Sequence, residues 1–578
     1  MTESDISDCV PSKTPLNQSY YYGKTDTPIS TKTIKQCLVE AANGKPEHII
    51  YRIPEYKDSI TLKALLEQSE RFSRSLLHHG VSQGDVVMVL GVSTCDYFVM
   101  FHGTVGIGAQ FFSPFLFEPP EKNTIELINL VRPSIIIIGY EVAFLTGCIR
   151  DYTTSSSDIK FKTIHYTPEK ITEPQLNSDE LYTYEQFLNS GDVLKTGDQL
   201  ASAARCVVYT DTAYLQCTSG TTGKFKVVLL SHRTLINSAI FGENRKNPNR
   251  KRVVFAFCCR QLDDITLLLD SLTPICNWRH GVVGVVMPST SLTDPLSLLK
   301  FIQDEKIETL QGFPYFVTPL IGHPASSDYD VSSWKSGILV AQIISKEFRQ
   351  WFAKNKPDYT IVYGGTECLG GTQTSPIYST KQQFIETVGY PFAHIELKLI
   401  GDDSSIVPIN TVGEICLKGW SVANGYLMDN GKVVTVCDKA GWVHMGDLGK
   451  MDETGHVTYI GRKSDCIRYK NKGDVVYPGE IENTVKTHPK VKDAVVVGVP
   501  HDIKGDDICL CVVLKDGDSL DEEGLETFCK KKLYSRDVPN YYFIMESFPV
   551  VGIRNKVSRA ELKNIVVKKI ETMKKEKS

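Results

Sequence analysis

The feature that decides the fold is the stretch Tyr214-Leu215-Gln216-Cys217-Thr218-Ser219-Gly220-Thr221-Thr222-Gly223-Lys224-Phe225-Lys226. In it an apolar strand runs into hydroxyl groups and glycines, two lysines follow, and a second apolar strand continues from Val227 to Leu230. Glycines let the backbone bend and bring N–H groups close to an anion, hydroxyls donate further hydrogen bonds, and a lysine neutralises charge. A plain Ser/Thr/Gly turn in a hairpin is the alternative. The order of the residues favours an anion-binding loop, although the spacing of a Walker A loop is absent.

On both sides of this stretch, short apolar runs alternate with amphipathic helices. Apolar residues between Leu62 and Leu76 fall on one helical face, and Gly80 would end that helix. The runs 86–90 and 135–138 are apolar and rich in β-branched residues, which predicts buried parallel strands. The alternation therefore predicts a layered α/β fold.

The texture of the sequence changes towards the C-terminus. Residues 410–465 combine short strands with many glycines, and a compact α+β pattern follows. In that pattern we predict helices at 480–487 and 520–532 and strands at 494–499 and 508–514. The predicted organisation is a polar, loose N-terminal arm at 1–30, a large domain at 31–464 and a small domain at 465–578, with the boundary at Asp465.

The composition excludes several classes of protein. Of the 578 residues, 42% are hydrophobic and 23% are charged, which is typical of a globular chain. Lys and Arg number 64 and Asp and Glu number 68, and the formal net charge of 64 − 68 = −4 argues against nucleic acid as a partner. The 16 cysteines are scattered without Cys-x-x-Cys spacing, which favours reduced packing residues over a metal site.

Targeting signals and membrane segments are also not predicted. No apolar run approaches the ~18–20 residues that span a bilayer. The acidic stretch Met1–Asp5 has neither a secretory nor a mitochondrial pattern, and the end Lys577-Ser578 is not a peroxisomal signal. We therefore expect a cytosolic protein without an integral membrane segment, and the sequence predicts no particular oligomeric state.

Four motifs occur in a fixed order along the chain. Thr218 to Gly223 and Lys226 match the pattern Thr-Ser-Gly-Thr-Thr-Gly-x-Pro-Lys-Gly, with Phe225 in place of Pro and Val227 in place of Gly. The other motifs are Tyr363-Gly364-Gly365-Thr366-Glu367, Gly441-Trp442-Val443-His444-Met445-Gly446-Asp447 and Gly461-Arg462-Lys463-Ser464-Asp465. On these residues the chain resembles the adenylate-forming enzymes, which include acyl-CoA and aryl-CoA ligases, beetle luciferases and peptide-synthetase adenylation domains. The resemblance extends from about residue 20 to about residue 565.

The resemblance implies a fold and a nucleotide site. It implies a large adenylating domain of layered α/β sheets with a small β-barrel-like subdomain, and a small, mobile α+β lid that pivots at Asp465. In the family, the ring at Tyr363 stacks on adenine, the Thr at 366 contacts the α-phosphate, and the Asp at 447 accepts the ribose hydroxyls. The residues implied to bind ATP or AMP are Thr218, Ser219, Gly220, Thr221, Thr222, Gly223, Lys224, Phe225, Lys226, Tyr363, Gly364, Gly365, Thr366, Asp447, Arg462 and Lys556.

The resemblance also implies catalytic groups. The stretch from Pro549 to Lys556 resembles the family's Pro-x-Thr-x-x-Gly-Lys pattern, with Asn555 in place of Gly. Lys556, Glu367 and Thr218 are the implied catalytic residues, and Glu367 is also the implied ligand of Mg²⁺. A surface lysine in a Lys-rich C-terminus is the alternative for Lys556.

The texture beyond residue 440 is similar to that of medium-chain fatty acyl-CoA ligases of the "family member 2" type, which are usually mitochondrial. This implies ATP, Mg²⁺ and CoA as cofactor and co-substrates, and a carboxylic acid as substrate. The mitochondrion is therefore the alternative location.

The acyl side of the implied site departs from the family. Arg260 stands where relatives have a His, and Val340 and Ala341 replace glycines that line the acyl tunnel. A branched side chain there would shorten or block a packed channel. The implied acyl-pocket residues are Arg260, Gly312, Val340 and Ala341. Three hypotheses follow: an acyl-CoA ligase, a luciferase-like adenylating enzyme that does not use CoA, and a nucleotide-binding pseudoenzyme.

Overall fold

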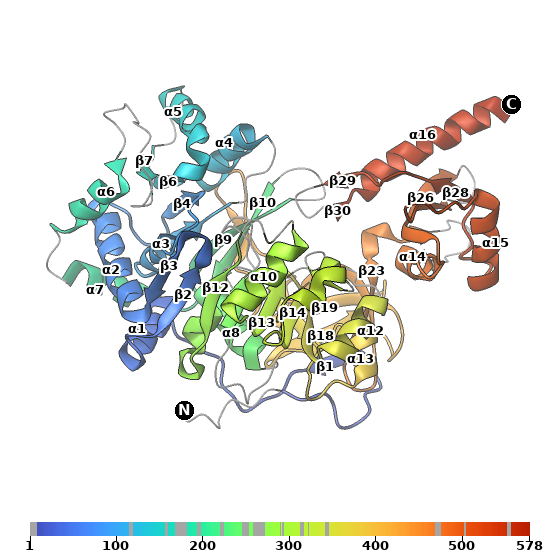
Figure 1. Cartoon of the computed structure of the whole chain (residues 1–578), viewed down its shortest axis with the longest axis horizontal. Helices are drawn as coiled ribbons and strands as arrows, with labels where there is room; N and C mark the ends of the chain where they lie inside the picture. Colours follow the sequence, from blue (N-terminus) through green and yellow to red (C-terminus); the bar gives the residue numbers. More distant parts are fainter. Residues whose placement is uncertain are drawn as a thin grey trace.

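The structure is a computed structural model. It describes residues 9–114, 119–155, 160–167, 182–193, 198–219, 225–244, 254–257, 272–288, 291, 294–312, 317–321, 323–340, 346–468, 475–501, 505–551 and 556–577. The described elements form a large N-terminal domain and a small C-terminal domain, which lies at the right of Figure 1. This arrangement confirms the predicted α/β class.

The glycine- and hydroxyl-rich motif is carried by a nine-stranded mixed sheet, which contains the strands before and after it. Its central strands β4 and β6 are buried at every residue and pair in parallel, as their β-branched runs predict. Strands β9 and β10 pair antiparallel, which makes them a hairpin. In order across the sheet the strands are β21 (Val433–Val434), β20 (Gly425–Leu427), β10 (Phe225–Ser231), β9 (Thr212–Ser219), β5 (Gln110–Phe112), β4 (Val86–Leu90), β6 (Ile135–Gly139), β7 (Lys162–Tyr166) and β8 (Tyr182–Thr183).

A second nine-stranded sheet carries the Tyr363 motif. Its strands β13, β14 and β15 pair in parallel, so their carboxyl ends meet at one edge, where ligands bind in open α/β sheets. In order the strands are β17 (Tyr390–Pro391), β16 (Cys368–Gln373), β15 (Asp358–Gly365), β14 (Ser336–Val340), β13 (Thr309–Gly312), β11 (Val254–Phe257), β12 (Val283–Val286), β2 (Ile49–Ile53) and β3 (Asp58–Thr61).

The region where the sequence implies a barrel-like subdomain folds as a five-stranded antiparallel sheet. Its strands in order are β1 (Tyr20–Tyr22), β18 (Ile395–Ile400), β19 (Gly413–Gly419), β22 (Val443–Met451) and β23 (Val457–Arg462). The first of these strands corrects a prediction, because a loose arm is expected there. Instead β1 pairs with β18, and Cys9 and Ser19 are fully buried. Three successive tyrosines have a high strand propensity, and a sheet edge offers unpaired backbone groups to them.

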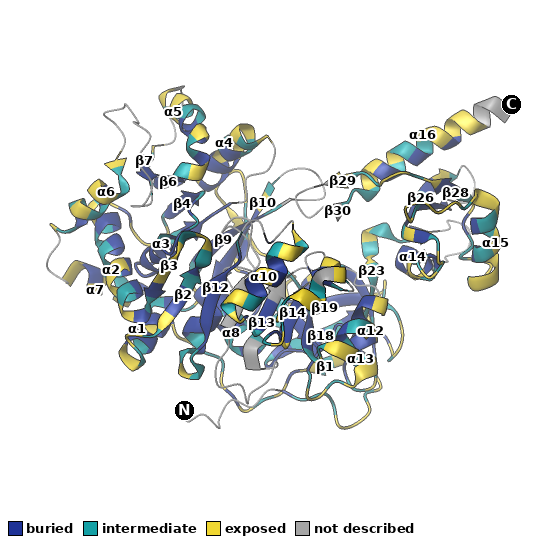
Figure 2. Ribbon diagram, viewed as in Figure 1, coloured by how far each residue is buried: buried dark blue, intermediate teal, exposed yellow. Residues whose placement is uncertain are grey.

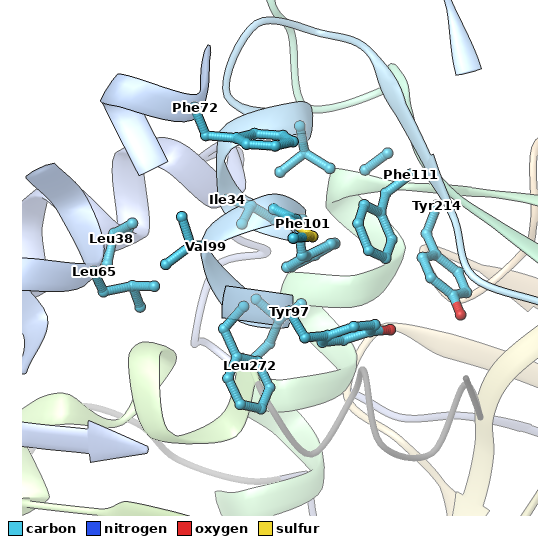
Figure 3. Packing of buried hydrophobic residues seen from close by; sticks show 14 of the residues in the cluster. Ile34, Leu38, Leu65, Phe72, Tyr97, Val99, Phe101, Phe111, Tyr214 and Leu272 are labelled. Atoms are coloured by element: carbon cyan, nitrogen blue, oxygen red, sulfur yellow. The ribbon is translucent and has the colours of Figure 1, made fainter. Parts of the chain in front are cut away.

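Helices cover the sheets of the large domain, and α8 packs against β10 of the hairpin. Helix α2 begins at the N-cap Thr61, which accepts a hydrogen bond from the backbone N–H of Ala64 at 3.2 Å. Figure 3 shows the packing of buried aromatic rings beside the first sheet. The ring of Phe111 on β5 lies 5.4 Å from that of Tyr97 on α3 and 6.2 Å from that of Tyr214 on β9. The α-helices of this domain are α1 (Ile34–Gly44), α2 (Leu62–His78), α3 (Asp96–Val105), α4 (Pro120–Val131), α5 (Thr146–Ser155), α6 (Tyr184–Gly191), α7 (Asp198–Cys206), α8 (His232–Asn244), α10 (Pro295–Glu305), α12 (Lys346–Asn355) and α13 (Lys381–Glu386).

The small domain has the predicted α+β pattern. A three-stranded sheet of β26 (Val491–His501), β27 (Gly505–Leu514) and β28 (Tyr541–Ile544) packs with α14 (Pro478–Val485), α15 (Glu522–Lys532) and α16 (Arg559–Lys577). Two short hairpins accompany it, β24 (Ile467–Arg468) with β25 (Val475–Val476) and β29 (Val550–Val551) with β30 (Lys556–Val557). Helix α16 runs outward to the C-terminus, and exposed residues become frequent along it (Figure 2).

Candidate functional site

The β9–β10 hairpin holds the glycine- and hydroxyl-rich motif at its end. The register pairs Ser219 with Phe225 and Thr218 with Lys226. Thr218 and Phe225 are half-buried, and Lys226 is exposed. The predicted residues Gly220, Thr221, Thr222, Gly223 and Lys224 lie outside the described residues, as does the side chain of Ser219.

Strand β20 brings a tyrosine beside this hairpin. Tyr426 pairs with Val228, so its side chain shares a face with that of Lys226 two residues earlier. The Lys226 Nζ lies 5.4 Å from the centre of the Tyr426 ring. The Tyr426 hydroxyl donates to Glu367 Oε1 at 2.7 Å. The second motif of the sequence is thereby joined to the first.

Glu367 lies in the turn between β15 and β16 with Thr366, and both are half-buried. The turn is tight: a Cβ on Gly364 would lie 2.8 Å from the carbonyl oxygen of Cys368, so a larger residue would force the backbone to shift. A Cβ on Gly365 would lie 3.2 Å from Glu367 Oε2 and 3.1 Å from the Met445 methyl group. The Glu367 carboxylate is therefore next to the strand that carries Asp447.

Asp447 is buried at the centre of a polar cluster. Tyr363 donates to its Oδ2 at 2.7 Å, and the Arg462 Nε and Tyr459 hydroxyl lie 3.2 Å and 3.4 Å from its Oδ1. Strands β22 and β23 create this contact, because their register places Arg462 opposite Asp447. Burial, and then the charge of Asp447, raise the pKa of Tyr363 well above its ordinary value, so its phenol keeps the donated proton. Burial lowers the pKa of Arg462, but Asp447 and its neighbours more than offset this and raise it overall.

Two aromatic rings accompany this cluster. The Tyr363 ring is buried and lies 6.0 Å from the Tyr459 ring, which is half-buried. Tyr363 lies in one of the four sequence motifs, whereas Tyr459 lies in none of them and is not predicted as a site residue. Its position three residues before Arg462 on a strand next to Asp447 is the signal that would have indicated it.

A second polar cluster lies where the two domains join. Arg559, at the start of α16, bonds to Glu482 through two nitrogens at 2.7 Å and 2.9 Å, and its Nε lies 3.3 Å from Asp465 Oδ2. It also donates to the carbonyl oxygen of Val496 at 2.7 Å. Arg559 follows Lys556 by three residues, and β30, which carries Lys556, pairs with β29. The side chain of Lys556 lies outside the described residues.

The implied acyl-pocket residues end neighbouring strands. Gly312 ends β13 and Val340 ends β14, and Val340 pairs with Val362, one residue before Tyr363. The backbone thus brings Gly312, Val340 and the Tyr363 motif to one edge of the second sheet. Arg260 and Ala341 lie outside the described residues, and so does the side chain of Val340.

Among the described residues, the Glu367 carboxylate contacts Tyr426 beside the hairpin, and a second carboxylate is buried at Asp447. Within the described ranges, no three His, Cys, Asp or Glu side chains come together as a metal site. Glu367 alone fits Mg²⁺, which proteins usually hold by one or two carboxylates together with substrate phosphates and water. The buried Asp447 fits hydroxyl donors. No described helix has the length and apolarity that a membrane crossing requires.

Comparisons with known proteins show similarity in sequence and in fold. The chain is 25% identical to the human "Medium-chain acyl-CoA ligase ACSF2, mitochondrial" over 578 aligned positions, which cover 94% of this chain and 89% of the relative. Its fold is similar to that of ATP-bound MatB from Rhodopseudomonas palustris, with a TM-score of 0.76, 19% identity and coverage of 93% and 99% of the two chains. It is also similar to that of the amide bond synthetase McbA from Marinactinospora thermotolerans, with a TM-score of 0.72, 20% identity and coverage of 92% and 99%.

The family models give the assignment. The model described as "AMP-binding enzyme" matches residues 38–427, and the model of the "AMP-binding enzyme C-terminal domain" matches residues 480–553. The first match alone covers more than half of the 578 residues. The chain therefore belongs to the AMP-binding enzymes, the adenylate-forming family that its four motifs resemble.

Proposed function

We propose that the chain is an ATP-dependent acyl-CoA ligase (an AMP-forming acid–thiol ligase) that acts on a carboxylic acid, most simply a fatty acid of medium length. The acid is activated as acyl-AMP with release of pyrophosphate, and the acyl group then passes to CoA. The observation that carries the proposal is the buried Asp447 carboxylate, which contacts Tyr363, Arg462 and Tyr459 on a strand that also passes the turn holding Glu367. The printed name of the human relative supports the choice of acid.

Asp447 is proposed to bind the ribose. A carboxylate accepts at about four positions and is the kind of group to which ribose hydroxyls donate. The contact to Tyr459 is the longest of the three at 3.4 Å. Two ribose hydroxyls are accommodated if Tyr459 releases Asp447, and the Tyr459 ring is then available beside the base.

The phosphates are proposed to lie between the hairpin and Glu367. The hydroxyls, backbone N–H groups and lysines of the motif from Thr218 to Lys226 are the groups proposed to bind them, and Thr366 is proposed to contact the α-phosphate. Glu367 and the phosphates would hold Mg²⁺, which when bound neutralises charge that develops on the leaving pyrophosphate. Phosphoryl chemistry of this kind depends mainly on positioning and charge neutralisation.

The acid is proposed to enter beside Gly312, Val340 and Ala341, with Arg260 near its carboxylate. A carboxylate oxygen attacks the α-phosphorus, the bond to the β-phosphate oxygen breaks, and pyrophosphate leaves. The CoA thiolate then attacks the acyl carbon, and AMP leaves with the electron pair of the broken bond. We assign residues 31–464 to the adenylation domain, 465–578 to a lid that turns about Asp465, and 1–30 to an N-terminal segment.

Pyrophosphate release tests the proposal. The protein is mixed with Mg-ATP and a panel of straight-chain and aromatic acids, with and without CoA. We expect release with at least one acid and formation of its acyl-CoA when CoA is present. No release with any acid, while nucleotide still binds, would make the chain a nucleotide-binding pseudoenzyme. Release without conversion to acyl-CoA would support instead the adenylating enzyme that does not use CoA, a chemistry for which Arg260 and Val340 leave room.

The Lys556→Ala substitution tests the proposed cation. We expect at least a hundredfold loss of acid-dependent pyrophosphate release, because a placed charge on a developing anion is worth several kcal/mol. Conversion of supplied acyl-AMP to acyl-CoA should change much less. Lys568→Ala, an exposed lysine on α16, is the matched control. An unchanged adenylation rate in K556A would remove Lys556 from the mechanism.

The location is proposed separately from the chemistry. The cytosol and the mitochondrion are the two predictions, and the word "mitochondrial" in the human relative's name agrees with the second. Fluorescence microscopy of the full chain with a C-terminal tag distinguishes them.

A further inference from the structure

Tyr426 lies between two groups of opposite charge at the β9–β10 hairpin, and none of the four motifs contains it. Its hydroxyl donates to Glu367 Oε1 at 2.7 Å, and the Lys226 Nζ lies 5.4 Å from its ring centre. The ring is held in place by the backbone, since β20 pairs with β10 and the N–H of Asn424 donates to the carbonyl of Leu229 at 2.8 Å. The position of Tyr426 is therefore set by the sheet.

The arrangement keeps a carboxylate and an ammonium apart. In the described part of the chain, Glu367 and Lys226 each contact Tyr426, and neither forms an ion pair. A direct ion pair would neutralise both groups before a ligand arrived. A phenol that donates to a carboxylate leaves the negative charge in place, and the face of an aromatic ring attracts an ammonium only weakly at an exposed site.

We propose that Tyr426 is a positioning residue that holds the Glu367 carboxylate in place for a nucleotide-bound Mg²⁺ and keeps Lys226 available to a phosphate. The inference rests on the proposed function and assigns a further residue to the same site. Tyr426 acts through these two neighbours and does not itself touch the reacting atoms.

The protonation of Tyr426 agrees with this role. Burial, and then its hydrogen bond to Glu367, raise the pKa of Tyr426 above its ordinary value. The phenol therefore stays protonated at neutral pH and remains a donor. Of the described residues, Glu367 on the β15–β16 turn and Lys226 on β10 are charged groups in contact with Tyr426.

The test measures nucleotide binding with and without metal. Calorimetry follows the affinity of a non-hydrolysable ATP analogue for the wild type, Tyr426→Phe, Tyr426→Leu and Tyr20→Phe, in Mg²⁺ and in EDTA. Tyr20 is the matched control, because its hydroxyl donates to Glu396 at the same distance of 2.7 Å, far from the hairpin. We expect Y426F to weaken binding about tenfold in Mg²⁺ and to leave binding in EDTA unchanged, since it loses one hydrogen bond to a charged group and keeps the ring. Y426L should weaken both, because Lys226 is then free to pair with Glu367.

Two results would overturn the proposal: a Y426F that matches Y20F in both solutions, or one that loses affinity equally in both. Glu367→Gln provides a second test that does not depend on how Y426F folds. It should abolish the Mg²⁺ contribution at an unchanged melting temperature, and Y426F in that background should add nothing. A metal contribution that survives E367Q would contradict the role of Tyr426 as well.

The outcome also separates this proposal from the proposed function. A wild type that binds the analogue with a Mg²⁺ contribution but releases no pyrophosphate overturns the ligase function and still allows the Tyr426 comparison. A wild type that binds no nucleotide overturns both.

Discussion

Two arginine–aspartate pairs lie near the end of strand β23, and they differ in which residue is at the centre of the contacts. In the first, Asp447 is the buried centre, and Arg462 is one of three donors and half exposed, with 51% of its side chain accessible. In the second, Arg559 is the centre, and Asp465 and Glu482 are two of its acceptors. The same two residue types thus surround a carboxylate in one place and a guanidinium in the other.

The two pairs also differ in the segments of the chain that their contacts connect. The guanidinium of Arg559 is surrounded by acceptors from η7 (Lys463–Asp465), α14 and β26, so it connects three segments to α16. The carboxylate of Asp447 accepts from Tyr363 on β15 and contacts Arg462 on β23, which belong to two different sheets. The contacts of Asp447 thus join two sheets of the large domain, whereas those of Arg559 join short segments of the chain to α16.

The largest expected effect is on stability and belongs to Arg559. Arg559→Met should lower the free energy of unfolding by roughly 3 kcal/mol, because Glu482 is 4% accessible at its side chain and would keep a buried charge without its partner. Arg462→Met, the matched substitution at the other pair, should cost less, roughly 1–2 kcal/mol, because the equally buried Asp447 loses a single contact at 3.2 Å and keeps the hydrogen bond from Tyr363. Urea unfolding of both variants measures the difference. Equal losses would show that the two pairs do the same work.

The next effect is on binding and belongs to Asp447. Asp447→Asn should weaken AMP about thirtyfold, or roughly 2 kcal/mol, because a charged acceptor for the ribose is lost. Asp465→Asn should leave AMP affinity unchanged. Calorimetric titration of both variants with AMP gives the comparison. A D447N protein with wild-type affinity would remove the ribose role from Asp447.

The smallest expected change is the loss of stability on substitution of Asp465. Asp465→Asn should lower the free energy of unfolding by less than about 1 kcal/mol, because its contact to Arg559 is 3.3 Å long and both side chains are partly exposed. Glu482 keeps Arg559 in place. The same urea experiment measures this change, and a loss as large as that of R559M would place the centre of the cluster at Asp465 instead.

The local features of the fold were predictable from the sequence. The β9–β10 strands follow from apolar runs on both sides of the glycine-rich motif, and helix α2 follows from its apolar face. Asp447 and Arg462 were found because each lies in a short motif with a fixed order. The roles of the loop residues, Arg260, Ala341 and the Lys556 side chain stay predictions.

The features that escaped prediction depend on partners far away in the chain. Tyr426 and Glu367 are 59 residues apart, and Arg559 and Glu482 are 77 residues apart. Neither spacing has a local signature, and Tyr426 is recognisable only once the register of β20 on β10 is known. For the same reason the sequence does not predict β1, since its pairing strand β18 begins 375 residues later in the chain, 395 − 20 = 375.

The pairing of β1 with β18 has a consequence for synthesis. Tyr20 is opposite Lys398, and 398 − 20 = 378 residues must be added before the partner exists. At about 5–20 residues per second, the tyrosine-rich strand leaves the ribosome roughly 20–75 s before its partner. The sheet that carries Asp447 and Arg462 therefore forms mostly from the last part of the large domain to be synthesised, and its edge strand β1 is synthesised long before the other four.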